Sequence, residues 1–403
     1  MSNWCANINK EMRLINVDSL DIESSFGQTK PYVILSHRWS PHEVEVKFED
    51  YASVKDKIKD QITKPQVDDP TTGISKIAKA CLQCRNLKLR YLWIDTCCID
   101  KRSTSEESES INSMFSWYNE AEICLVYLPD IGKGFPKAFS ESEWFTRGWT
   151  LQELLAPKDV TFFDRDWNNI GTKTSRSSDI EKATRIAHRH MIDFRTASIA
   201  TRMSWQAGRQ TTRAEDLAYS LFGIFDVAMD LRYGERDKAF RRLQEQIINS
   251  HPLDESILAW TSNEFGDDKE PGILAPRPDC FKGSANLTVA SPSHTYRPRN
   301  TYHISNKGLE ISVRMGTKTR LFFGNAPNEM IMFGEGLTRR NKLDVTLNCW
   351  EMGRQSPATV VIRLQRDDRG FFYRTNEKLG WAKSVDSRTI LGTDHTTPIS
   401  VKL

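Results

Sequence analysis

Four short apolar segments in the first half of the chain predict the strands of a buried sheet. Each is a nearly continuous apolar run that is too short for a helix and ends in a polar loop, which is typical of strands covered on both faces. The segments are residues 32–36, 91–96, 123–128 and 160–164. The weakly alternating residues 12–26 before them are expected to form an edge hairpin or an N-terminal flap.

Apolar residues at helical spacing lie between these predicted strands. One amphipathic helix is predicted over residues 74–82 and another over residues 111–118, which follow an acidic, serine-rich turn suited to a helix N-terminus. Residues 44–72 are rich in charge and poor in apolar anchors, so we expect an irregular insertion that contains a short helix.

The alternation of strand and helix indicates an α/β fold with a parallel sheet and helices on both faces. Ligands of such sheets bind beyond the carboxyl ends of the strands. The loops at 36–43, 95–103 and 129–145 are all expected at that edge. Neither G-x-G-x-x-G nor G-x-x-x-x-G-K-[ST] occurs in the chain, which argues against a dinucleotide-dependent dehydrogenase and a P-loop enzyme.

The pattern changes twice in the second half of the chain. Residues 175–250 contain amphipathic helical segments without strands, and a Gly/Pro/Asp-rich linker follows at 266–278. Beyond the linker the apolar period becomes two, which predicts strands. The alternating segments are residues 301–305, 309–314, 320–324, 330–334, 343–350, 359–365 and 370–375. We therefore predict an α/β core at 1–174, a helical part at 175–265 and a β-rich domain at 266–403.

Composition narrows the class of protein. The 403 residues are 38% hydrophobic and 27% charged, which is typical of a globular protein. The net charge of +3 is too small to argue for binding to nucleic acid or to a membrane surface. The chain shows neither a membrane-spanning apolar run nor an apolar signal core at its start. We expect a cytoplasmic location, in which the eight cysteines remain thiols.

Residues 143–157 carry the candidate chemistry. If this segment is helical, Trp149 and Glu153 lie on one face, one turn apart. An indole beside a carboxylate, with the Arg147 guanidinium nearby, suits a flat cationic ligand that carries phosphates. The alternative is structural, because Thr150-x-x-Glu153 also fits a capping box, in which the glutamate bonds the first amide of the helix. Spacing alone favours the capping interpretation.

Several blocks resemble the fungal heterokaryon-incompatibility (HET) domain. In chain order they are ILSHRW, LWIDTCCIDK, SMFSWYNEAEICLVYL, WFTRGWTLQELLAP, FFDRDW and MSWQAGRQTTRAEDLAYSLFGIF. The resemblance runs from about residue 12 to about residue 250. It implies a cytoplasmic role in self/non-self recognition and regulated cell death. The β-rich C-terminal region looks like the variable extension of such proteins.

A second resemblance is to Toll/interleukin-1 receptor (TIR) domains, and it implies a TIR/flavodoxin-like parallel sheet. YVILSHRWSPHE looks like their first strand and loop, SINSMFSWYNEAEICLVYL is similar to a later helix and strand, and WTLQEL resembles the segment that holds the glutamate of TIR-type NAD hydrolases. The resemblance implies that Glu153 is the catalytic glutamate and Trp149 its neighbour, and that a nucleotide pocket is lined by Ser36, His37, Arg38 and Trp39. The stretch 44–72 is longer and more charged than a usual TIR loop, so the resemblance does not specify how the pocket closes.

The chemistry of NAD⁺ cleavage is compatible with a single carboxylate. Nicotinamide leaves as a neutral group from a cationic ring, so no general acid is needed, and one carboxylate can hold the ribose hydroxyls and stabilise the oxocarbenium-like transition state. Trp149 or Trp144 is a candidate to stack on the pyridinium, an attraction of about 1–2 kcal/mol when desolvated. Arg38 and Arg147 are candidates to neutralise the pyrophosphate.

Other polar residues at the expected sheet edge have two interpretations. His37 is a candidate ligand contact, although a histidine at a strand end is more often structural. Asp95 and Asp100 are candidate ligand-binding carboxylates, although capping of the next helix is the commoner role for such residues. The basic turn at 209–213 either meets phosphate or faces water, and the second interpretation is favoured.

The cysteines offer a third, weaker chemistry. Cys97 or Cys98 could act as a nucleophile with His37, but thiols that follow a buried strand are usually packing residues. Cys81-x-x-Cys84 falls on a predicted helix without a second ligand pair nearby, which argues against zinc. We expect no metal site and no cofactor apart from NAD⁺ as the substrate.

Two functional hypotheses remain. The first is a cell-death effector that hydrolyses NAD⁺ through Glu153. The second is a non-catalytic TIR-like signalling module that assembles with itself or with an upstream incompatibility receptor. The two can hold together, since TIR-type catalysis commonly needs an assembled array. The expected partners are therefore NAD⁺ and a homo-oligomer or receptor, without nucleic acid or a membrane span.

Overall fold

The computed structural model divides into two compact units. The structure describes residues 12–25, 30–39, 45–64, 69–261 and 272–289, and the strands between residues 302 and 401. Unit 1 comprises Met1–Ile192, Arg209–Thr211 and Tyr219–Leu231. Unit 2 comprises Asp193–Gly208, Thr212–Ala218 and Arg232–Leu403. Both units are thus discontinuous along the chain. The sequence division at 174/175 and 265/266 stays a prediction.

Unit 1 is built on a seven-stranded sheet with the order β2-β1-β4-β3-β5-β6-β7. The four central strands β4, β3, β5 and β6 are parallel, whereas β1, β2 and β7 pair antiparallel at the edges. The strands are β1 (Met12–Asn16), β2 (Ile22–Ser25), β3 (Tyr32–His37), β4 (Tyr91–Trp93), β5 (Ile123–Tyr127), β6 (Val160–Phe163) and β7 (Asn169–Thr172). The predicted α/β class with a largely parallel sheet and flanking helices is confirmed.

The parallel strands wind in two directions from β3. The chain forms β3 first, continues to β4 on one side, and then returns to β5 and β6 on the other side. Ligands of open α/β sheets bind beside such a reversal, at the carboxyl ends of the two strands that flank it. Here those ends are Ser36 and His37 of β3, which are in register with Val126 and Tyr127 of β5.

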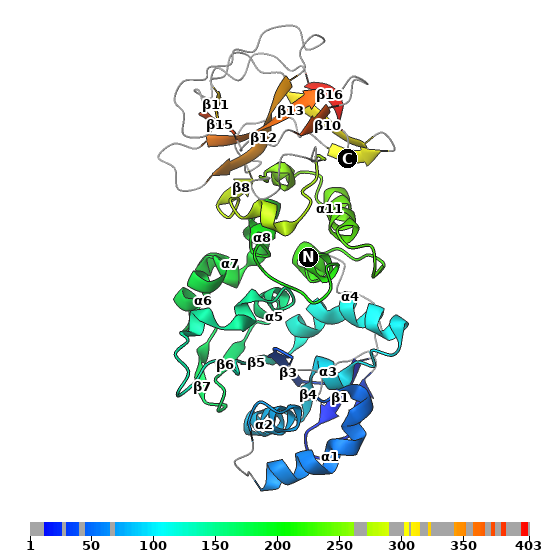
Figure 1. The fold of residues 1–403 in the computed structure, drawn as a ribbon, viewed down its shortest axis with the longest axis vertical. Coiled ribbons are helices and arrows are strands. Elements are labelled where there is room, and N and C mark those ends of the chain that lie inside the picture. Colours follow the sequence, from blue (N-terminus) through cyan, green and yellow to red (C-terminus); the bar gives the residue numbers. More distant parts are fainter. Residues whose placement is uncertain are drawn as a thin grey trace. The chain divides into compact units, whose positions relative to one another are not determined.

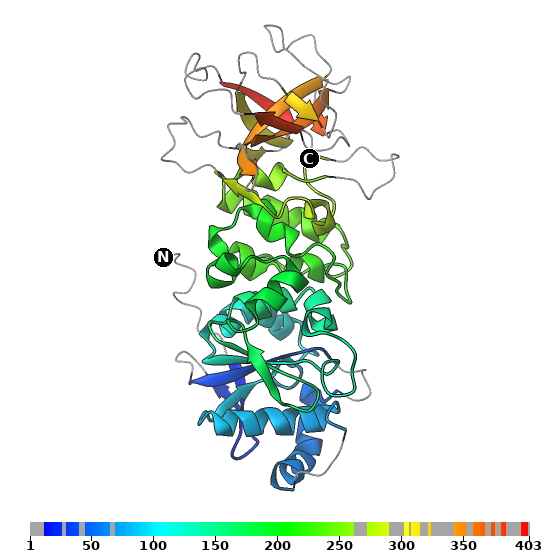
Figure 2. The same cartoon turned by 90° about the vertical axis from the view of Figure 1, so that its left-hand side faces the viewer.

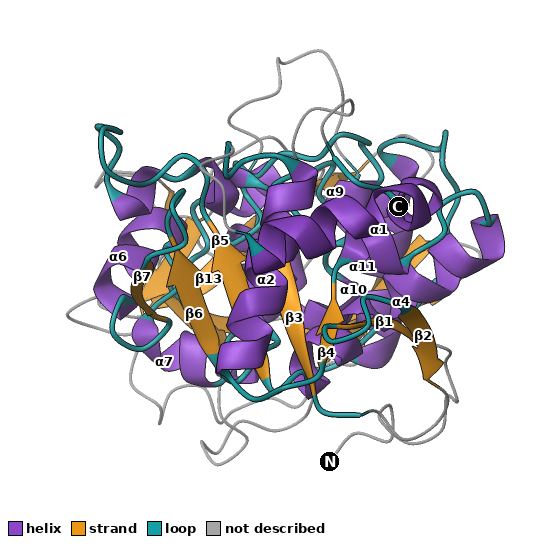
Figure 3. Ribbon diagram, turned by 90° about the horizontal axis from the view of Figure 1, so that it is seen from below, coloured by secondary structure: helices purple, strands orange, loops and turns teal. Residues whose placement is uncertain are grey.

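Helices cover both faces of this sheet. Figure 1 shows α1 and α2 on one side and α4 and α5 on the other, and Figure 2 shows the same layers after a quarter turn. Seen from below, α1 and α2 lie across the strands (Figure 3). The helices of unit 1 are α1 (Phe48–Thr63), α2 (Gly73–Asn86), α3 (Asp95–Cys98), α4 (Thr104–Glu120), α5 (Thr150–Leu155), α6 (Ser177–Thr184), α7 (His188–Ile192) and α10 (Phe222–Phe225), with 3-10 turns at Phe139–Glu141 and Glu143–Thr146.

Two local predictions in unit 1 are wrong. The stretch 44–72 contains the 16-residue helix α1 rather than a short one. Its buried residues are Tyr51, Ile58 and Ile62, so one narrow apolar stripe was hidden among many charges. The predicted strand 91–96 stops at Trp93, because Asp95 already begins the short helix α3.

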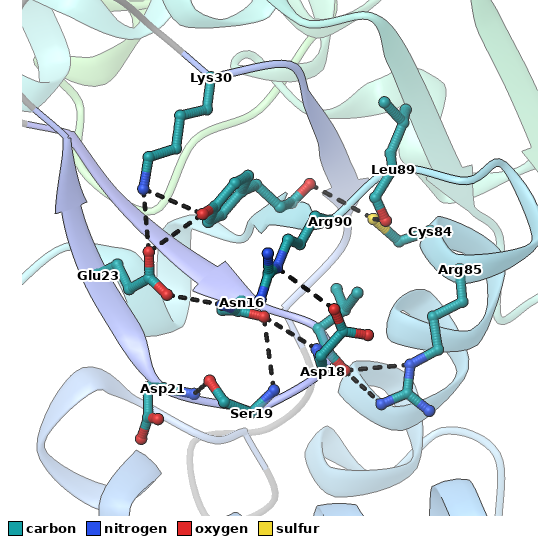
Figure 4. Close-up of polar contacts among 12 residues, drawn as sticks. Asn16, Asp18, Ser19, Asp21, Glu23, Lys30, Cys84, Arg85, Leu89 and Arg90 are labelled. Carbon is teal, nitrogen blue, oxygen red and sulfur yellow. Dashed lines mark hydrogen bonds and ion pairs between the residues drawn. The ribbon is translucent and has the colours of Figure 1, made fainter.

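The predicted edge hairpin is confirmed as β1 and β2, and polar contacts fasten it to its neighbours (Figure 4). The Glu23 carboxylate accepts hydrogen bonds from Asn16 Nδ2 at 2.7 Å and from Lys30 Nζ at 3.0 Å. Lys30 also donates to the Tyr91 hydroxyl on β4 at 3.0 Å, and Arg85 of α2 donates to the Val17 carbonyl. The hairpin therefore closes the edge of the sheet instead of leaving β4 uncovered.

Unit 2 joins a helical part to a nine-stranded, mainly antiparallel sheet. The predicted switch to a period of two is confirmed on the two central strands, where Leu347 and Cys349 of β12, and Val360, Ile362 and Leu364 of β13, are buried. The predicted segment 330–334 lies outside the described residues. The strands are β8 (Leu287–Val289), β9 (Tyr302–Ser305), β10 (Gly308–Arg314), β11 (Leu321–Phe323), β12 (Lys342–Glu351), β13 (Ala358–Arg366), β14 (Phe372–Arg374), β15 (Gly380–Lys383) and β16 (Thr396–Val401).

The helical region predicted over 175–250 is confirmed, although its helices are divided between the two units. Those of unit 2 are α8 (Ile199–Ser204) and α11 (Lys238–Ser250), with 3-10 turns at Phe194–Thr196, Glu255–Leu258 and Pro278–Phe281, while α9 (Asp216–Tyr219) spans a unit boundary in the sequence. Phe240, Leu243 and Ile247 form the buried stripe of α11. Among the described residues, no helix has the length and apolarity that a membrane crossing needs.

A close contact between α10 and α4 ties residues 219–231 into unit 1. Gly223 packs against Phe115, and a Cβ atom placed on Gly223 would lie 2.0 Å from Phe115 Cγ and 2.1 Å from Phe115 Cβ. These atoms are near the backbone of Phe115, so the ring cannot simply swing away. Only a glycine fits at this crossing without a shift of one helix.

We predict that Gly223→Ala lowers the free energy of unfolding by about 1–3 kcal/mol, because overpacking forces the two helices apart. Urea unfolding followed by tryptophan fluorescence measures the change. Gly283→Ala is the matched control, since a Cβ there meets no atom within 4 Å. Equal stability of the Gly223 and Gly283 variants would contradict the packing argument.

Candidate functional site

Glu153 lies on α5 and is directed toward the carboxyl end of β3. Leu151 and Leu154, on the same short helix, are fully buried and anchor it in the core. Glu153 itself is only 8% exposed, and its Oε2 accepts a hydrogen bond from the hydroxyl of Ser36. A carboxylate from a helix and a hydroxyl from a strand, 117 positions apart in sequence, therefore meet beside the winding reversal of the sheet.

The direction of this hydrogen bond agrees with the contact to Trp144. The indole Nε1 of Trp144 donates to Ser36 Oγ at 2.8 Å. An indole nitrogen can only donate, so Ser36 accepts from Trp144 and its own proton is left for Glu153. The result is a buried chain, Trp144 to Ser36 to Glu153, in which each donor has one acceptor.

The capping-box interpretation of Glu153 is wrong. The N-cap of α5 is Trp149, which makes no side-chain capping bond. The Thr150 hydroxyl instead donates to the carbonyls of Trp144 at 2.7 Å and Arg147 at 2.9 Å. Glu153 reaches across to β3 rather than back to its own helix, so its role is in the tertiary structure.

Burial dominates the ionisation of Glu153. It raises the pKa of this carboxyl from the usual 4.5 to about 7, and the negative charge of Asp95 acts in the same direction. The hydrogen bond from Ser36, the positive charge of Arg147 and the Tyr118 hydroxyl act in the opposite direction by favouring the carboxylate. Glu153 is thus about half ionised near pH 7, a range in which an acid or a base can act.

The same burial closes the site in this structure. Ser36 is fully buried, and Trp144 is 1% exposed with its ring against Phe145 and Phe162. Trp144 therefore contributes its N–H to the site and shows no open ring face. A ligand that bonds Glu153 has to reach a carboxylate that is almost fully buried and already accepts a hydrogen bond from Ser36.

Two arginines lie near this cluster. Arg147 is partly buried and favours the ionised form of Glu153. Arg209 is 6% exposed and donates from Nη1 to the Arg147 carbonyl at 2.9 Å and to Thr150 Oγ1 at 3.0 Å. The expectation that the basic turn 209–213 faces water is wrong for Arg209, although it holds for Arg213, which is exposed.

The predicted edge residues Trp39 and Asp95 form a second, more open group. Trp39 is 44% exposed, and its Nε1 donates to Asp95 Oδ2 at 2.8 Å. The Lys101 ammonium lies 3.4 Å from the centre of the Trp39 ring on one face. Arg38, next to Trp39, pairs with Glu143 at the surface. These side chains border the carboxyl end of β3 without contacting the carboxylate of Glu153.

His37 points into a buried charged cluster rather than toward Glu153. Its Nε2 lies 3.7 Å from Glu45 Oε1, and Glu45 Oε2 accepts a hydrogen bond of 2.6 Å from Lys76 on α2. Burial opposes ionisation of Glu45, but His37 and Lys76 hold its pKa below the usual range. The structural interpretation of His37 fits this geometry.

Asp100, Cys97 and Cys98 make their contacts outside the cluster. Asp100 pairs with Arg102 through two hydrogen bonds of 2.7 and 2.8 Å, which lowers its pKa to about 2. Cys97 and Cys98 are buried, and burial raises the pKa of both thiols, so neither is available as a thiolate near neutral pH. The cysteine nucleophile loses its physical basis.

The structure thus brings together Glu153, Ser36 and Trp144, and the charge of Arg147 acts on Glu153. Trp149, the N-cap of α5, is partly buried. Sequence reasoning missed Tyr118 and Arg209. Tyr118 lies on the helix predicted over residues 111–118, where its spacing is that of a core residue, and Arg209 belongs to a turn whose composition is that of an exposed loop. Both contacts depend on chain segments far apart in sequence, which no local pattern reports.

Comparisons with known proteins support one of the two resemblances. Residues 32–134 match the family model "Heterokaryon incompatibility protein (HET)". The chain is also 43% identical over 236 residues to "Vegetative incompatibility protein HET-E-1" of Podospora anserina, an alignment that covers 55% of this chain and 16% of that protein. The chain therefore spans only a minor part of the length of this relative. No solved structure matches. The HET resemblance is confirmed, and the TIR-like core stays a prediction.

Glu153→Gln should change how stability depends on pH. The raised pKa means that folded Glu153 keeps its proton where the unfolded chain has lost it, so the native state loses stability as pH rises from 4.5 to about 7. At about 1.4 kcal/mol per pH unit the loss is about 3 kcal/mol above pH 7. Glutamine has no proton to lose and still accepts the Ser36 bond.

We therefore expect Glu153→Gln to be more stable than the wild type at pH 8, by up to about 3 kcal/mol, and of similar stability at pH 4. Urea unfolding at a series of pH values measures the difference. A constant difference across this range would mean that Glu153 ionises at its usual pKa.

Proposed function

We propose that this chain is a HET-type cell-death effector in fungal incompatibility and that its unit 1 hydrolyses NAD⁺ at the N-glycosidic bond through Glu153. The family match and the relative named for vegetative incompatibility support the biological role. The observation that carries the chemical role is a carboxylate with a pKa of about 7, directed at the carboxyl end of β3 beside the winding reversal of a parallel sheet.

The winding supports a TIR/flavodoxin-like core for this proposal. Among the parallel strands the spatial order is second, first, third and fourth in chain order, as in flavodoxin-like sheets. The reversal then lies between β3 and β5, and Ser36 is the penultimate residue of β3. Ligands of open α/β sheets generally bind beside such a reversal, which supports this location independently of the TIR resemblance.

One ionised carboxylate would carry the reaction. The glycosidic bond of NAD⁺ breaks with its electron pair going to the nicotinamide nitrogen, which leaves positive charge on the ribose. Ionised Glu153 would accept hydrogen bonds from the ribose hydroxyls and stabilise that charge, and water would then add to the ribose and release a proton. Arg147 would face the pyrophosphate, and Trp149 or Trp39 would offer the ring for the pyridinium.

The closed geometry requires an opening step in this mechanism. The Ser36 hydroxyl occupies the acceptor position on Glu153 that a ribose hydroxyl would take. Substrate binding would exchange one hydroxyl for another, so the number of hydrogen bonds to the carboxylate is conserved. The opening step would require free energy to separate β3 from α5. Homo-oligomerisation or an upstream receptor that binds the open form would provide this free energy.

A second candidate function is a non-catalytic assembly module. The observation that favours it is the burial of Glu153, Ser36 and Trp144. The three residues would then form a purely structural cluster that holds α5 in place. Under this alternative the surface of unit 1 acts through contacts with other copies or a receptor, and the ionisation of Glu153 has no bearing on signalling.

We predict that concentrated protein releases nicotinamide from NAD⁺ and that Glu153→Gln lowers the rate at least a hundredfold, because the charge that stabilises the transition state is removed. Chromatographic measurement of nicotinamide gives the rate. The rate should rise with pH and level off above about pH 7, as Glu153 ionises. Glu181→Gln, an exposed carboxylate on α6, is the control and should keep the wild-type rate.

Expression of the same variants in fungal cells separates the two candidates. The enzyme proposal expects NAD⁺ depletion and death with the wild type and with Glu181→Gln, and neither with Glu153→Gln. Death that persists with Glu153→Gln at normal NAD⁺ levels would refute the enzyme proposal and support the assembly module.

A further inference from the structure

Residues 209–211 form a clasp on the segment that carries Trp144 and Glu153. The backbone N–H of Gln210 donates to the Thr146 carbonyl at 2.7 Å, and the Gln210 carbonyl accepts from the N–H of Gly148 at 2.9 Å. This is a parallel bridge between Gln210 and Arg147, outside any regular strand. The chain thus returns, about sixty positions later, to hold the turn between Glu143–Thr146 and α5.

The side chain of Arg209 reinforces the clasp from inside. Its Nη1 donates to the Arg147 carbonyl and to Thr150 Oγ1. The Thr150 hydroxyl in turn donates to the carbonyls of Trp144 and Arg147. Arg209 is therefore bonded to the first residue of α5 and to the turn before it, and through Thr150 to the backbone of Trp144.

These contacts determine where the two ends of the buried chain lie. Trp144 directs the Ser36 hydroxyl, and Glu153 accepts from it. Both residues are joined by the turn at 147–149, and Arg209 fixes that turn with a rigid, planar guanidinium. A lysine could supply the charge, but its three donors extend from one nitrogen on a flexible stem instead of from a planar, pre-organised fork.

We propose that Arg209 is the positioning residue of the Glu153 site, because it holds the turn between Trp144 and α5 so that the carboxylate stays in register with Ser36. Its catalytic consequence rests on the proposed NAD⁺ hydrolysis, but its structural consequence does not.

Electrostatics agree with this geometry. Burial lowers the pKa of Arg209 to about 10, and the negative charge of Glu153 opposes that decrease. Arg209 therefore remains protonated at neutral pH, and attraction between the two charges favours the ionised form of each. Loss of Arg209 should consequently make Glu153 harder to ionise.

The matched control is a second buried arginine. Arg202 on α8 of unit 2 is 7% exposed, and burial lowers its pKa to about 10 as well. The charges that act on Arg202 are Asp254 and Arg195 rather than Glu153. Arg202→Gln should therefore lower stability as Arg209→Gln does, without any effect on the titration of Glu153.

The experiment compares the wild type, Arg209→Gln, Arg209→Lys and Arg202→Gln, each in the full chain with and without Glu153→Gln. For each background, the pH dependence of the stability difference caused by Glu153→Gln gives the midpoint at which Glu153 ionises. We expect Arg209→Gln to raise this midpoint by about one pH unit. Arg209→Lys should raise it less, and Arg202→Gln should leave it unchanged.

Nicotinamide release supplies an independent reading. A midpoint one pH unit higher leaves about one tenth of Glu153 ionised at pH 7, instead of about half, so the rate of Arg209→Gln should fall at least about fivefold at pH 7 and partly recover at pH 9. Arg202→Gln should show the wild-type pH profile.

An unchanged midpoint in both Arg209 variants, with a stability loss like that of Arg202→Gln, would overturn the proposal and make Arg209 a packing residue. If Arg209→Gln does not fold, Arg209→Lys decides, since it keeps a charge and loses only the planar fork. If the wild type releases no nicotinamide, NAD⁺ hydrolysis fails as a function, while the stability titration still decides the role of Arg209.

Discussion

The organising constraint of unit 1 is a carboxylate taken out of water. Glu153 is buried on a helix whose leucines are part of the core, so its oxygens have to be satisfied by the protein. Ser36 supplies the bond, Trp144 orients Ser36, and Thr150 and Arg209 fix the turn that joins the two. The strand, turn, helix and clasp are thus arranged around one acidic group, so a change in any of them is expected to change the ionisation of Glu153.

The parts of the fold that the sequence predicted are those that burial imposes locally. The apolar run at 32–36 predicts β3 because a strand covered on both faces has few polar positions. The helix at 74–82 is recognisable because its buried face carries apolar residues at helical spacing. The early end of β4 at Trp93 was not predictable, because Asp95 begins the helix α3 and its carboxylate is bonded by Trp39 from a distant segment. The short helix predicted within 44–72 underestimates the length of α1, since only three buried residues mark its apolar stripe.

The site shows the same division. The resemblance to TIR domains predicts Glu153 as the acidic residue of the site, whereas spacing alone favoured the capping box, which the Ser36 bond excludes. Trp144 was expected to offer a ring face, whereas its buried ring leaves only the N–H to act. Arg209 was expected in solvent. Each error has one cause: a side chain's role depends on the partner that the fold brings to it from a distant segment.

The interleaving of the two units along the chain restricts how such a protein can evolve. Residues 209–211 and 219–231 belong to unit 1, yet pieces of unit 2 precede and separate them. A single recombination event anywhere between residues 193 and 231 would therefore pair part of one parent's clasp or α10 with the other parent's sheet. Neither unit can be exchanged whole at one crossover, so an exchange between relatives that keeps each unit intact needs several crossovers within residues 192–232.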